Sequence, residues 1–190
     1  MVNICEKLLL SKTVLSIATK LSKSVTNSEI IDIHSDEYFM GEALRLAYKA
    51  YQLDETPIGA VIVSNGKIIA RAFNQVELLK DATAHAEMLA LTAAQNQFGD
   101  WRLTDCTLYV TKEPCPMCAG AIYHTRIRKV VYGVSDPKAG AAGSAMNILQ
   151  FPSLNHHCEI LSGVRQEECK NIIQNFFRAK RSKDILPKYQ

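Results

Sequence analysis

Two motifs of this chain contain side chains that bind transition metals or move protons. His85 and Glu87 stand in an H-x-E motif, and Cys115 and Cys118 stand in a P-C-x-x-C motif that begins at Pro114. One imidazole and two thiolates are suitable ligands for Zn²⁺, and three protein ligands leave the fourth tetrahedral position open for water. The motifs therefore predict a catalytic site with one Zn²⁺ per subunit, held by His85, Cys115 and Cys118.

Two other interpretations of these cysteines are open. A structural zinc site would need a fourth cysteine or histidine, and the remaining candidates His124, His156 and His157 lack a matched partner spacing. A C-x-x-C pair could also be a redox dithiol. Either motif alone is a weak signal, and the two together favour the catalytic site.

Glu87 is not needed as a metal ligand, so its place beside the open position suits a proton shuttle. In hydrolytic deamination of a nucleobase, such a group takes a proton from the attacking water and delivers it to the ring nitrogen and then to the departing amine. A solvated surface position is the commoner fate of glutamate. The motif argues against that fate here and makes Glu87 the candidate catalytic residue.

The H-x-E spacing also constrains where the motif sits on a helix. Residues two apart face nearly opposite sides of a regular helix, so His85 and Glu87 cannot both reach one site from mid-helix. We expect His85 in the first turn, with Thr83 as its cap, and we expect Pro114 to mark the entry of the next helix. Both motifs would then lie at helix amino termini, whose dipoles favour anions and lower the pKa of thiols.

The elements that must position these motifs alternate between helix and strand. Apolar spacing predicts a helix that begins at Ser35 and ends near Gln52, and β-branched runs at 58–63 and 67–73 around Asn65-Gly66 predict a hairpin. Further along, the patterns predict helices at 83–95, 115–124 and 164–180 and strands at 107–111 and 129–133. Such alternation requires at least one parallel strand pair joined by a helical crossover.

Composition limits the class of protein without selecting a function. The chain has 190 residues, a formal net charge of +3 and six cysteines that are not spaced like a secreted disulfide framework. We expect one globular domain at 35–181, a helical or loose N-terminal extension at 1–34, a tail at 182–190 and no transmembrane segment. The predicted location is the cytoplasm, and organellar import directed by the extension is the alternative.

From about residue 36 to residue 181 the chain resembles the bacterial tRNA-specific adenosine deaminases. The resemblance includes segments 55–60, 83–87 and 114–120 and the Gly/Ala loop at 136–144, which is the most discriminating of them. It implies a cytidine-deaminase-like α/β fold, a three-layer α/β/α sandwich with a central mixed sheet of about five strands. It also implies hydrolytic deamination of adenosine to inosine at the wobble position of tRNA by a homodimer.

Roles for three residues outside the zinc motifs follow from this resemblance alone. Asn74 would hydrogen-bond the flipped purine, Asp136 would contact the ribose of a neighbouring nucleotide, and Phe177 would pack on a base of the anticodon stem-loop. The clustering of basic residues in the sequence separately predicts a phosphate-binding rim around the pocket, formed by Arg126, Arg128, Lys129, Lys138, Arg178, Lys180 and Arg181. The open alternatives are a turn residue for Asn74, a loop cap for Asp136, core packing for one of Phe176 and Phe177, and a solvated face for the basic set.

Two other functions remain open for the sequence. The first is a deaminase of a free base or nucleotide, such as guanine or cytidine, which would act on the small molecule without RNA. The second is a non-catalytic subunit that only binds tRNA. Glu87 argues against this second function, because such a subunit has no use for a proton shuttle.

Overall fold

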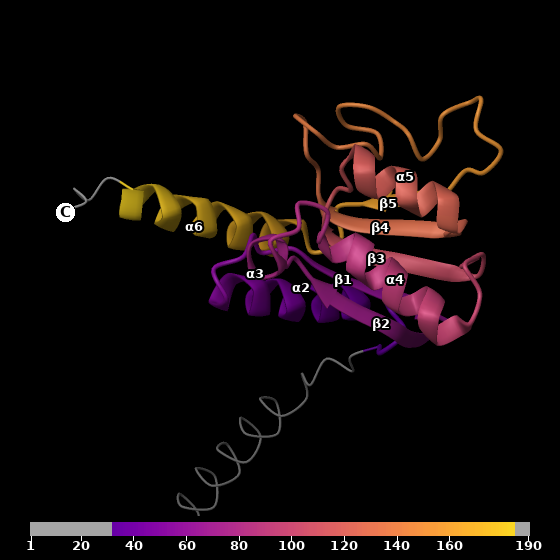
Figure 1. Ribbon diagram of the computed structural model, residues 1–190, viewed down its shortest axis with the longest axis horizontal. Helices are drawn as coiled ribbons and strands as arrows, with labels where there is room; N and C mark the ends of the chain where they lie inside the picture. Colours follow the sequence, from indigo (N-terminus) through magenta and orange to yellow (C-terminus); the bar gives the residue numbers. More distant parts are fainter. Residues whose placement is uncertain (1–31, 185–190) are drawn as a thin grey trace, which may run out of the picture. The chain divides into compact units, whose positions relative to one another are not determined.

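The computed structural model describes residues 32–184 and contains a five-stranded mixed sheet with the strand order β2-β1-β3-β4-β5 (Figure 1). The strands are β1 (Gly59–Ser64), β2 (Lys67–Phe73), β3 (Cys106–Lys112), β4 (Lys129–Val134) and β5 (Glu159–Ser162). Strand β1 is antiparallel to β2 and β3, whereas β3, β4 and β5 are parallel. The predicted hairpin and the predicted parallel pair are both confirmed.

The helices are α2 (Asp36–Gln52), α3 (Val76–Leu79), α4 (Ala86–Phe98), α5 (Pro116–Thr125) and α6 (Gln166–Asp184). Helix α2 begins where the sequence predicts, because the Ser35 side chain accepts a hydrogen bond of 3.1 Å from the backbone N–H of Tyr38. Between β1 and β2, Asn65 and Gly66 adopt φ angles of 49° and 71°. These left-handed conformations suit asparagine and glycine in a tight hairpin turn.

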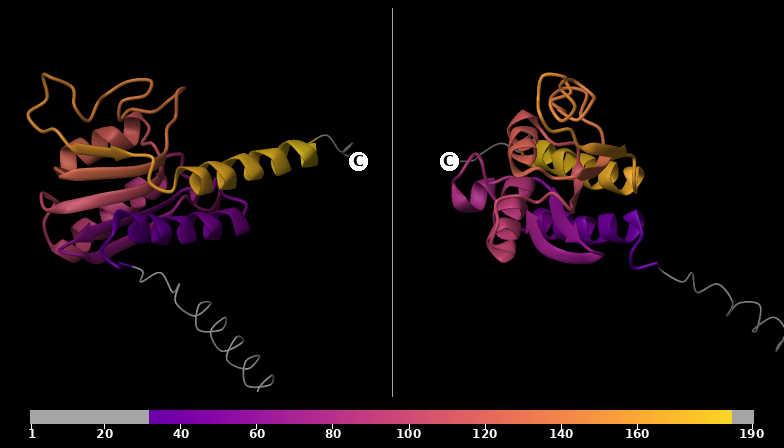
Figure 2. Two further views of the ribbon diagram at one scale, coloured as in Figure 1. Left: turned by 180° about the vertical axis from the view of Figure 1, so that it is seen from behind. Right: turned by 90° about the vertical axis from the view of Figure 1, so that its right-hand side faces the viewer.

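Alternate residues of the central strands face two separate cores, as the period of a strand requires. Ile62 of β1 and Leu108 of β3 belong to the core that lies under α4 and α5. Val61 of β1 and Tyr109 of β3 belong to the core shared with α2 and α6. The helices therefore cover both faces of the sheet (Figures 1 and 2), which confirms the three-layer α/β/α sandwich.

Two short elements, β5 and α3, were not predicted from the sequence patterns. Strand β5 lies at the edge of the sheet, pairs only with β4, and has exposed residues at Glu159, Leu161 and Ser162, so it lacks an apolar run. Helix α3 is a single turn without buried residues. A short edge strand and one helical turn bury too little apolar surface to leave a periodic signal.

The predicted extension at 1–34 lies almost entirely outside the described residues. Helix α6 continues to Asp184, whereas the prediction places the tail at 182–190. Within residues 32–184, none of the helices has the length and apolar character that crossing a membrane requires.

Candidate active site

The two metal-binding motifs lie at the amino termini of α4 and α5. His85 is the N-cap residue of α4 and Cys115 is the N-cap residue of α5, both with extended backbone conformations and neither with a capping hydrogen bond from its side chain. Cys118 is the third residue of α5, and side chains at the N-cap and third positions approach each other, as they do in a capping box. This geometry explains why a C-x-x-C spacing brings both thiols to one point.

The three side chains converge on a space that fits a metal ion. His85 Nδ1 lies 3.7 Å from Cys115 Sγ and 3.5 Å from Cys118 Sγ. All three ligand atoms lie within 4.8 Å of one another. Zinc–sulfur bonds of about 2.3 Å and zinc–nitrogen bonds of about 2.0 Å at tetrahedral angles require N···S separations of about 3.5 Å. The group therefore has the donor set and the spacing of a tetrahedral zinc site with three protein ligands.

The surroundings favour the thiolate form of Cys115, which is the form that binds metals. Hydrogen bonds from Cys118 and His85 lower the pKa of Cys115 to about 4, against the opposing effect of burial. The position at the start of α5 acts in the same direction, because the positive end of a helix dipole stabilises an anion.

Glu87 lies in the first turn of α4 and is 3% exposed. Its Oε2 atom is buried, and no hydrogen-bond partner for it lies within residues 32–184. Burial raises the pKa of the Glu87 carboxyl group, which also interacts with His85, Cys115 and Cys118. A buried carboxyl oxygen without a partner is costly, so its place beside His85, Cys115 and Cys118 makes Glu87 a candidate functional residue.

Asn74 follows β2 and is 3% exposed, so it is not an exposed turn residue. Its Nδ2 donates a hydrogen bond of 3.0 Å to Oε2 of the buried Glu55. The other oxygen of Glu55 accepts a hydrogen bond of 2.6 Å from the backbone N–H of Leu78, in α3. Glu55 therefore fixes the orientation of the Asn74 amide, a function that sequence reasoning did not assign to it.

Asp136 begins the Gly/Ala loop after β4, and its carboxylate is already engaged. Oδ1 accepts hydrogen bonds from the backbone N–H groups of Lys138 and Ala139, at 3.0 and 3.3 Å. Oδ2 lies 2.7 Å from the Nζ atom of Lys112, the last residue of β3. The loop-cap interpretation thus describes its contacts, and the ribose contact stays a prediction.

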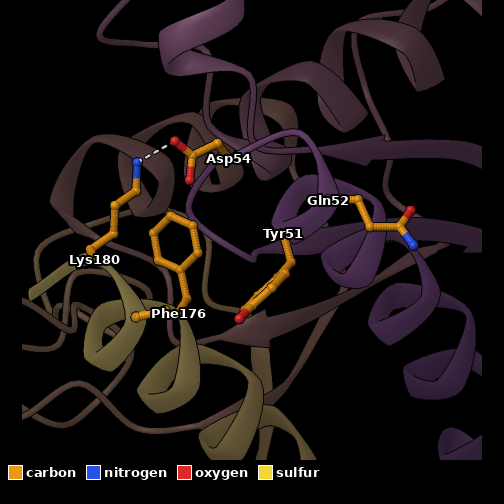
Figure 3. A pocket seen from close by; sticks show the side chains of 6 residues that line it. Tyr51, Gln52, Asp54, Phe176 and Lys180 are labelled. Carbon is orange, nitrogen blue, oxygen red and sulfur yellow. Dashed lines mark hydrogen bonds and ion pairs between the residues drawn. The ribbon is translucent and has the colours of Figure 1, made fainter. Parts of the chain in front are cut away.

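The predicted RNA-contact residues of α6 are both on its surface. Phe177 is 43% exposed, whereas Phe176 is buried and packs edge-on against Tyr51, which assigns the core position to Phe176. Lys180 lies 2.6 Å from Asp54 in the hollow shown in Figure 3. Arg181 is exposed one residue further on. The contacts of Phe177 and Arg181 with RNA stay predictions.

The basic residues do not form one rim around the metal ligands. Arg128 and Lys129 stand at the start of β4, whereas Cys115 follows the end of the neighbouring parallel strand β3. A strand of this length separates its ends by about 20 Å. Lys129 is also half-buried and lies 3.1 Å from Asp36. For these two residues the predicted position at the pocket is wrong, because residues close in sequence to a motif can lie at the other end of the sheet.

Two details of the predicted helix starts are also corrected. Thr83 does not cap α4, because its hydroxyl bonds Asp81 and His85 itself occupies the N-cap position. His85 therefore lies one residue before the first turn. Only Glu87 is within the helix, so the rule that residues two apart face opposite sides of a helix does not separate the two side chains. The proline that opens α5 is Pro116, in the first turn, rather than Pro114.

Comparison with known proteins agrees with this geometry. The MafB19-like deaminase family matches residues 34–181. A tRNA-specific adenosine deaminase of Bacillus subtilis (strain 168) is 52% identical over 148 residues, which are 78% of this chain and 92% of the relative. A protein of the same name from Haemophilus influenzae is 44% identical over 154 residues, which are 80% of this chain and 89% of the relative.

Solved structures extend the comparison to the fold. A structure from a study of A-to-I editing by tRNA:A34 deaminases has a TM-score of 0.69 and 44% identity, and the alignment covers 71% of this chain and 98% of that chain. A guanine deaminase from Nitrosomonas europaea has a TM-score of 0.66 at 23% identity over 75% of this chain and 84% of that chain, a likeness of fold alone. The chain therefore belongs to the MafB19-like deaminases and, among them, to the family of tRNA-specific adenosine deaminases.

Proposed function

We propose that this protein is a hydrolytic, zinc-dependent deaminase that converts adenosine to inosine at the wobble position of tRNA. The observation that carries the proposal is the buried Oε2 atom of Glu87 beside the three-ligand group of His85, Cys115 and Cys118. A solvent-excluded carboxyl group beside such a group can exchange protons with a water molecule and a substrate. Relatives named tRNA-specific adenosine deaminase support the choice of substrate.

One Zn²⁺ per subunit would be held by His85, Cys115 and Cys118, and when bound it would activate a water molecule at its fourth position. Cys115 would bind it as the thiolate, in line with its lowered pKa. Because both helix amino termini point their dipoles at this space, they would stabilise the negative charge that the activated water acquires.

Glu87 would move the protons of the reaction. Its carboxylate accepts a proton from the attacking water and donates it to N1 of the adenine ring, while the water oxygen bonds to C6. The second proton of the water then passes through Glu87 to the 6-amino group, the C6–N6 bond breaks, and ammonia leaves. Water and adenosine thus give inosine and ammonia without an oxidant or reductant.

The substrate would be the anticodon stem-loop of tRNA, with the target base turned out of the stack. Asn74, fixed by Glu55, would hydrogen-bond the purine, and Asp136 would accept a hydrogen bond from a ribose hydroxyl, which favours RNA over DNA. Phe177 and Arg181 of α6 would contact a base and a phosphate. These contacts rest on the family resemblance and on the exposure of both α6 side chains.

The direct test incubates purified protein with an unmodified tRNA that carries adenosine at the first anticodon position and measures inosine in the product. The same tRNA with guanosine at that position is the control for background signal. Turnover of guanine, cytidine or free adenosine without RNA, together with absence of inosine in the tRNA, would instead support a small-molecule deaminase. Binding of tRNA by the zinc-loaded protein without any turnover would support the non-catalytic subunit.

We also propose that the protein is a homodimer of the cytoplasm. Relatives that process tRNA support the location. Sedimentation of the purified protein at micromolar concentration measures the oligomeric state, and a monomer at all concentrations would contradict the dimer.

A further inference from the structure

Glu113 is a buried acid between β3 and Cys115 that the reaction described above does not use. It is 3% exposed and directly follows the last residue of β3. Its Oε2 accepts a hydrogen bond of 2.8 Å from the backbone N–H of Asp136, and its Oε1 accepts hydrogen bonds of 3.0 and 3.1 Å from the N–H groups of Ala142 and Ser144. One carboxylate therefore holds both ends of the loop at 136–144.

The loop is also bonded to the segment that carries the metal ligands. The backbone N–H of Ala141 donates a hydrogen bond of 2.8 Å to the carbonyl oxygen of Pro114, the residue before Cys115. Gly140 lies so close to Glu113 that a Cβ atom at this position would overlap the carboxyl group of Glu113. The loop is therefore a wall of the site that is packed directly against the start of α5.

Lys112, the residue before Glu113, contacts the same loop through the Asp136 side chain. Lys112 and Glu113 thus both hold Asp136. Lys112 pairs with the Asp136 carboxylate, and the Glu113 carboxylate accepts a hydrogen bond from the Asp136 backbone N–H. Because the Glu113 side chain is buried and its carboxylate binds three backbone N–H groups, it determines the path of the loop. The Lys112 contact is a single ion pair with a side chain, and it is partly exposed to solvent.

We propose that Glu113 is a positioning residue that fixes loop 136–144 beside Cys115 and so forms the nucleotide-binding wall of the site before RNA arrives. The proposal rests on the proposed function, since it names what positions Asp136 for that reaction. Glu113 acts through the loop and takes no part in proton transfer. Its loss therefore weakens substrate binding while the metal ligands and Glu87 keep their places.

The geometry makes Glu113→Gln the informative substitution. Three N–H donors share the two carboxylate oxygens, and an amide would replace one acceptor oxygen with an NH₂ group that faces at least one donor. The loss of a hydrogen bond to a charged acceptor should speed hydrogen exchange of the amides of Asp136, Ala142 and Ser144 by at least roughly tenfold. The matched control is Glu159→Gln, an exposed glutamate at the start of β5 whose side chain pairs with Arg128.

The experiment measures amide exchange, zinc content, and KM and kcat on tRNA for the wild-type protein and both variants. For Glu113→Gln we expect faster exchange in the loop, unchanged zinc, a KM raised by about tenfold and a kcat within about threefold of the wild-type value. Glu159→Gln should match the wild type in all of them. Unchanged loop exchange in Glu113→Gln, or a fall in kcat at unchanged KM, would overturn the proposal.

A second variant approaches the same contact from the loop. In Gly140→Ala the added methyl group overlaps the Glu113 carboxyl group and also the carbonyl oxygen of Asp136, so it disturbs the contact between Glu113 and the loop from both sides. This variant should show the same faster exchange and raised KM with zinc retained. If Glu113→Gln does not fold, Gly140→Ala tests whether the contact between Glu113 and the loop supports substrate binding. Normal exchange and a normal KM in Gly140→Ala would then reject the proposal. If the wild-type protein forms no inosine in tRNA, the proposed function fails, while the exchange and zinc measurements still decide whether Glu113 holds the loop.

Discussion

Two acidic residues near opposite ends of the parallel strands β3 and β4, Asp36 and Glu87, differ in whether their carboxyl oxygens have partners. At the amino end, Asp36 accepts a hydrogen bond of 2.6 Å from the Tyr109 hydroxyl and lies 3.1 Å from Lys129 Nζ. At the carboxyl end, Glu87 is buried with an oxygen that has no partner within residues 32–184. Paired charges can stabilise a fold, whereas a buried carboxyl oxygen without a partner costs stability. The carboxyl end also contains the Lys112–Asp136 ion pair, so the contrast concerns Asp36 and Glu87 themselves. We therefore expect Asp36 to support the fold and Glu87 to act in the proposed reaction.

The first turns of α2 and α4 show the same contrast at equivalent positions. Ser35 caps α2 with its hydroxyl, whereas His85 stands at the N-cap of α4 without a capping bond and faces the thiols of Cys115 and Cys118. In the second helical position, Glu37 of α2 is exposed and Glu87 of α4 is buried. Helix α4 thus lacks the capping bond that α2 has, at the position where the two candidate functional side chains lie.

The largest effect is expected from Cys115→Ser, which removes a ligand at the carboxyl end of β3. Zinc content should fall from about one equivalent per subunit to near zero, and inosine formation should be lost, because a serine hydroxyl replaces a thiolate poorly. The control is Cys158→Ser, whose hydroxyl can still donate to the carbonyl of Ile127 as the thiol does. Full zinc content in Cys115→Ser, measured by elemental analysis, would remove Cys115 from the site.

Glu55→Gln should have a smaller effect on the same end of the sheet. The amide loses one of the two acceptor oxygens that hold Asn74 and the backbone N–H of Leu78, so Asn74 is no longer fixed. We expect KM on tRNA to rise by about tenfold with unchanged zinc. Steady-state kinetics with the exposed control Glu77→Gln provide the check, and an unchanged KM would show that Asn74 needs no support from Glu55.

Asp36→Asn tests the amino end, where only stability should change. The variant weakens the hydrogen bond from Tyr109 and removes the ion pair with Lys129, so the free energy of unfolding should fall by about 1 kcal/mol. Turnover per zinc-loaded subunit should equal that of the wild type. Chemical denaturation and tRNA kinetics measure both values, and a clear loss of turnover in the folded variant would break the separation of the two ends.

The smallest effect concerns Lys112 and the pH dependence of stability. Partial burial acts to raise the pKa of Asp136, but Lys112 and the amides of Lys138 and Ala139 outweigh it, so the pKa lies below its ordinary value. A lowered carboxyl pKa gives stability that is present above the unfolded value near 4 and lost as the pH falls through the folded value. Lys112→Met should therefore be about 0.5 kcal/mol less stable than the wild type at pH 6.

The difference between Lys112→Met and the wild type should shrink as the pH falls below the unfolded value near 4 and through the lowered pKa of Asp136 in the folded protein. Unfolding curves recorded from well below that unfolded value up to neutral pH measure this change. A difference that is the same at both ends of the range would mean that Lys112 acts by packing rather than by its charge.

Strong local patterns made most of the fold predictable from sequence. The buried run of β1 and the Asn65-Gly66 turn define the hairpin, and Ser35 defines the start of α2. β5 has no such pattern, because its place at the sheet edge is decided by pairing with β4 and not by its own side chains. The sequence also does not show at which end of the sheet a residue lies, which is why Lys129 was wrongly placed at the pocket.

The convergence of His85, Cys115 and Cys118 was predictable because these side-chain types at this spacing are typical of a metal site, and their binding of zinc stays a prediction. Glu55 and Glu113 were not predictable, because a buried glutamate that binds backbone N–H groups has no spacing rule, and its donors come from segments 19 to 31 residues away. Such residues become visible only when the fold brings both segments together. For Glu113 the signal in the sequence was an acidic residue directly after a buried strand, whereas Glu55 lies four residues before β1 and had no such signal.

The most direct test of the account compares Glu87→Gln with Glu37→Gln, the same substitution at the same helical position of α4 and α2. Because Glu87 is assigned to proton transfer and not to the metal, Glu87→Gln should keep its zinc and its fold while single-turnover inosine formation falls by at least about 10²-fold. Glu37→Gln should retain the wild-type rate. Near-normal turnover in Glu87→Gln would contradict the proposed mechanism, and loss of zinc from it would make Glu87 a ligand or a structural support instead.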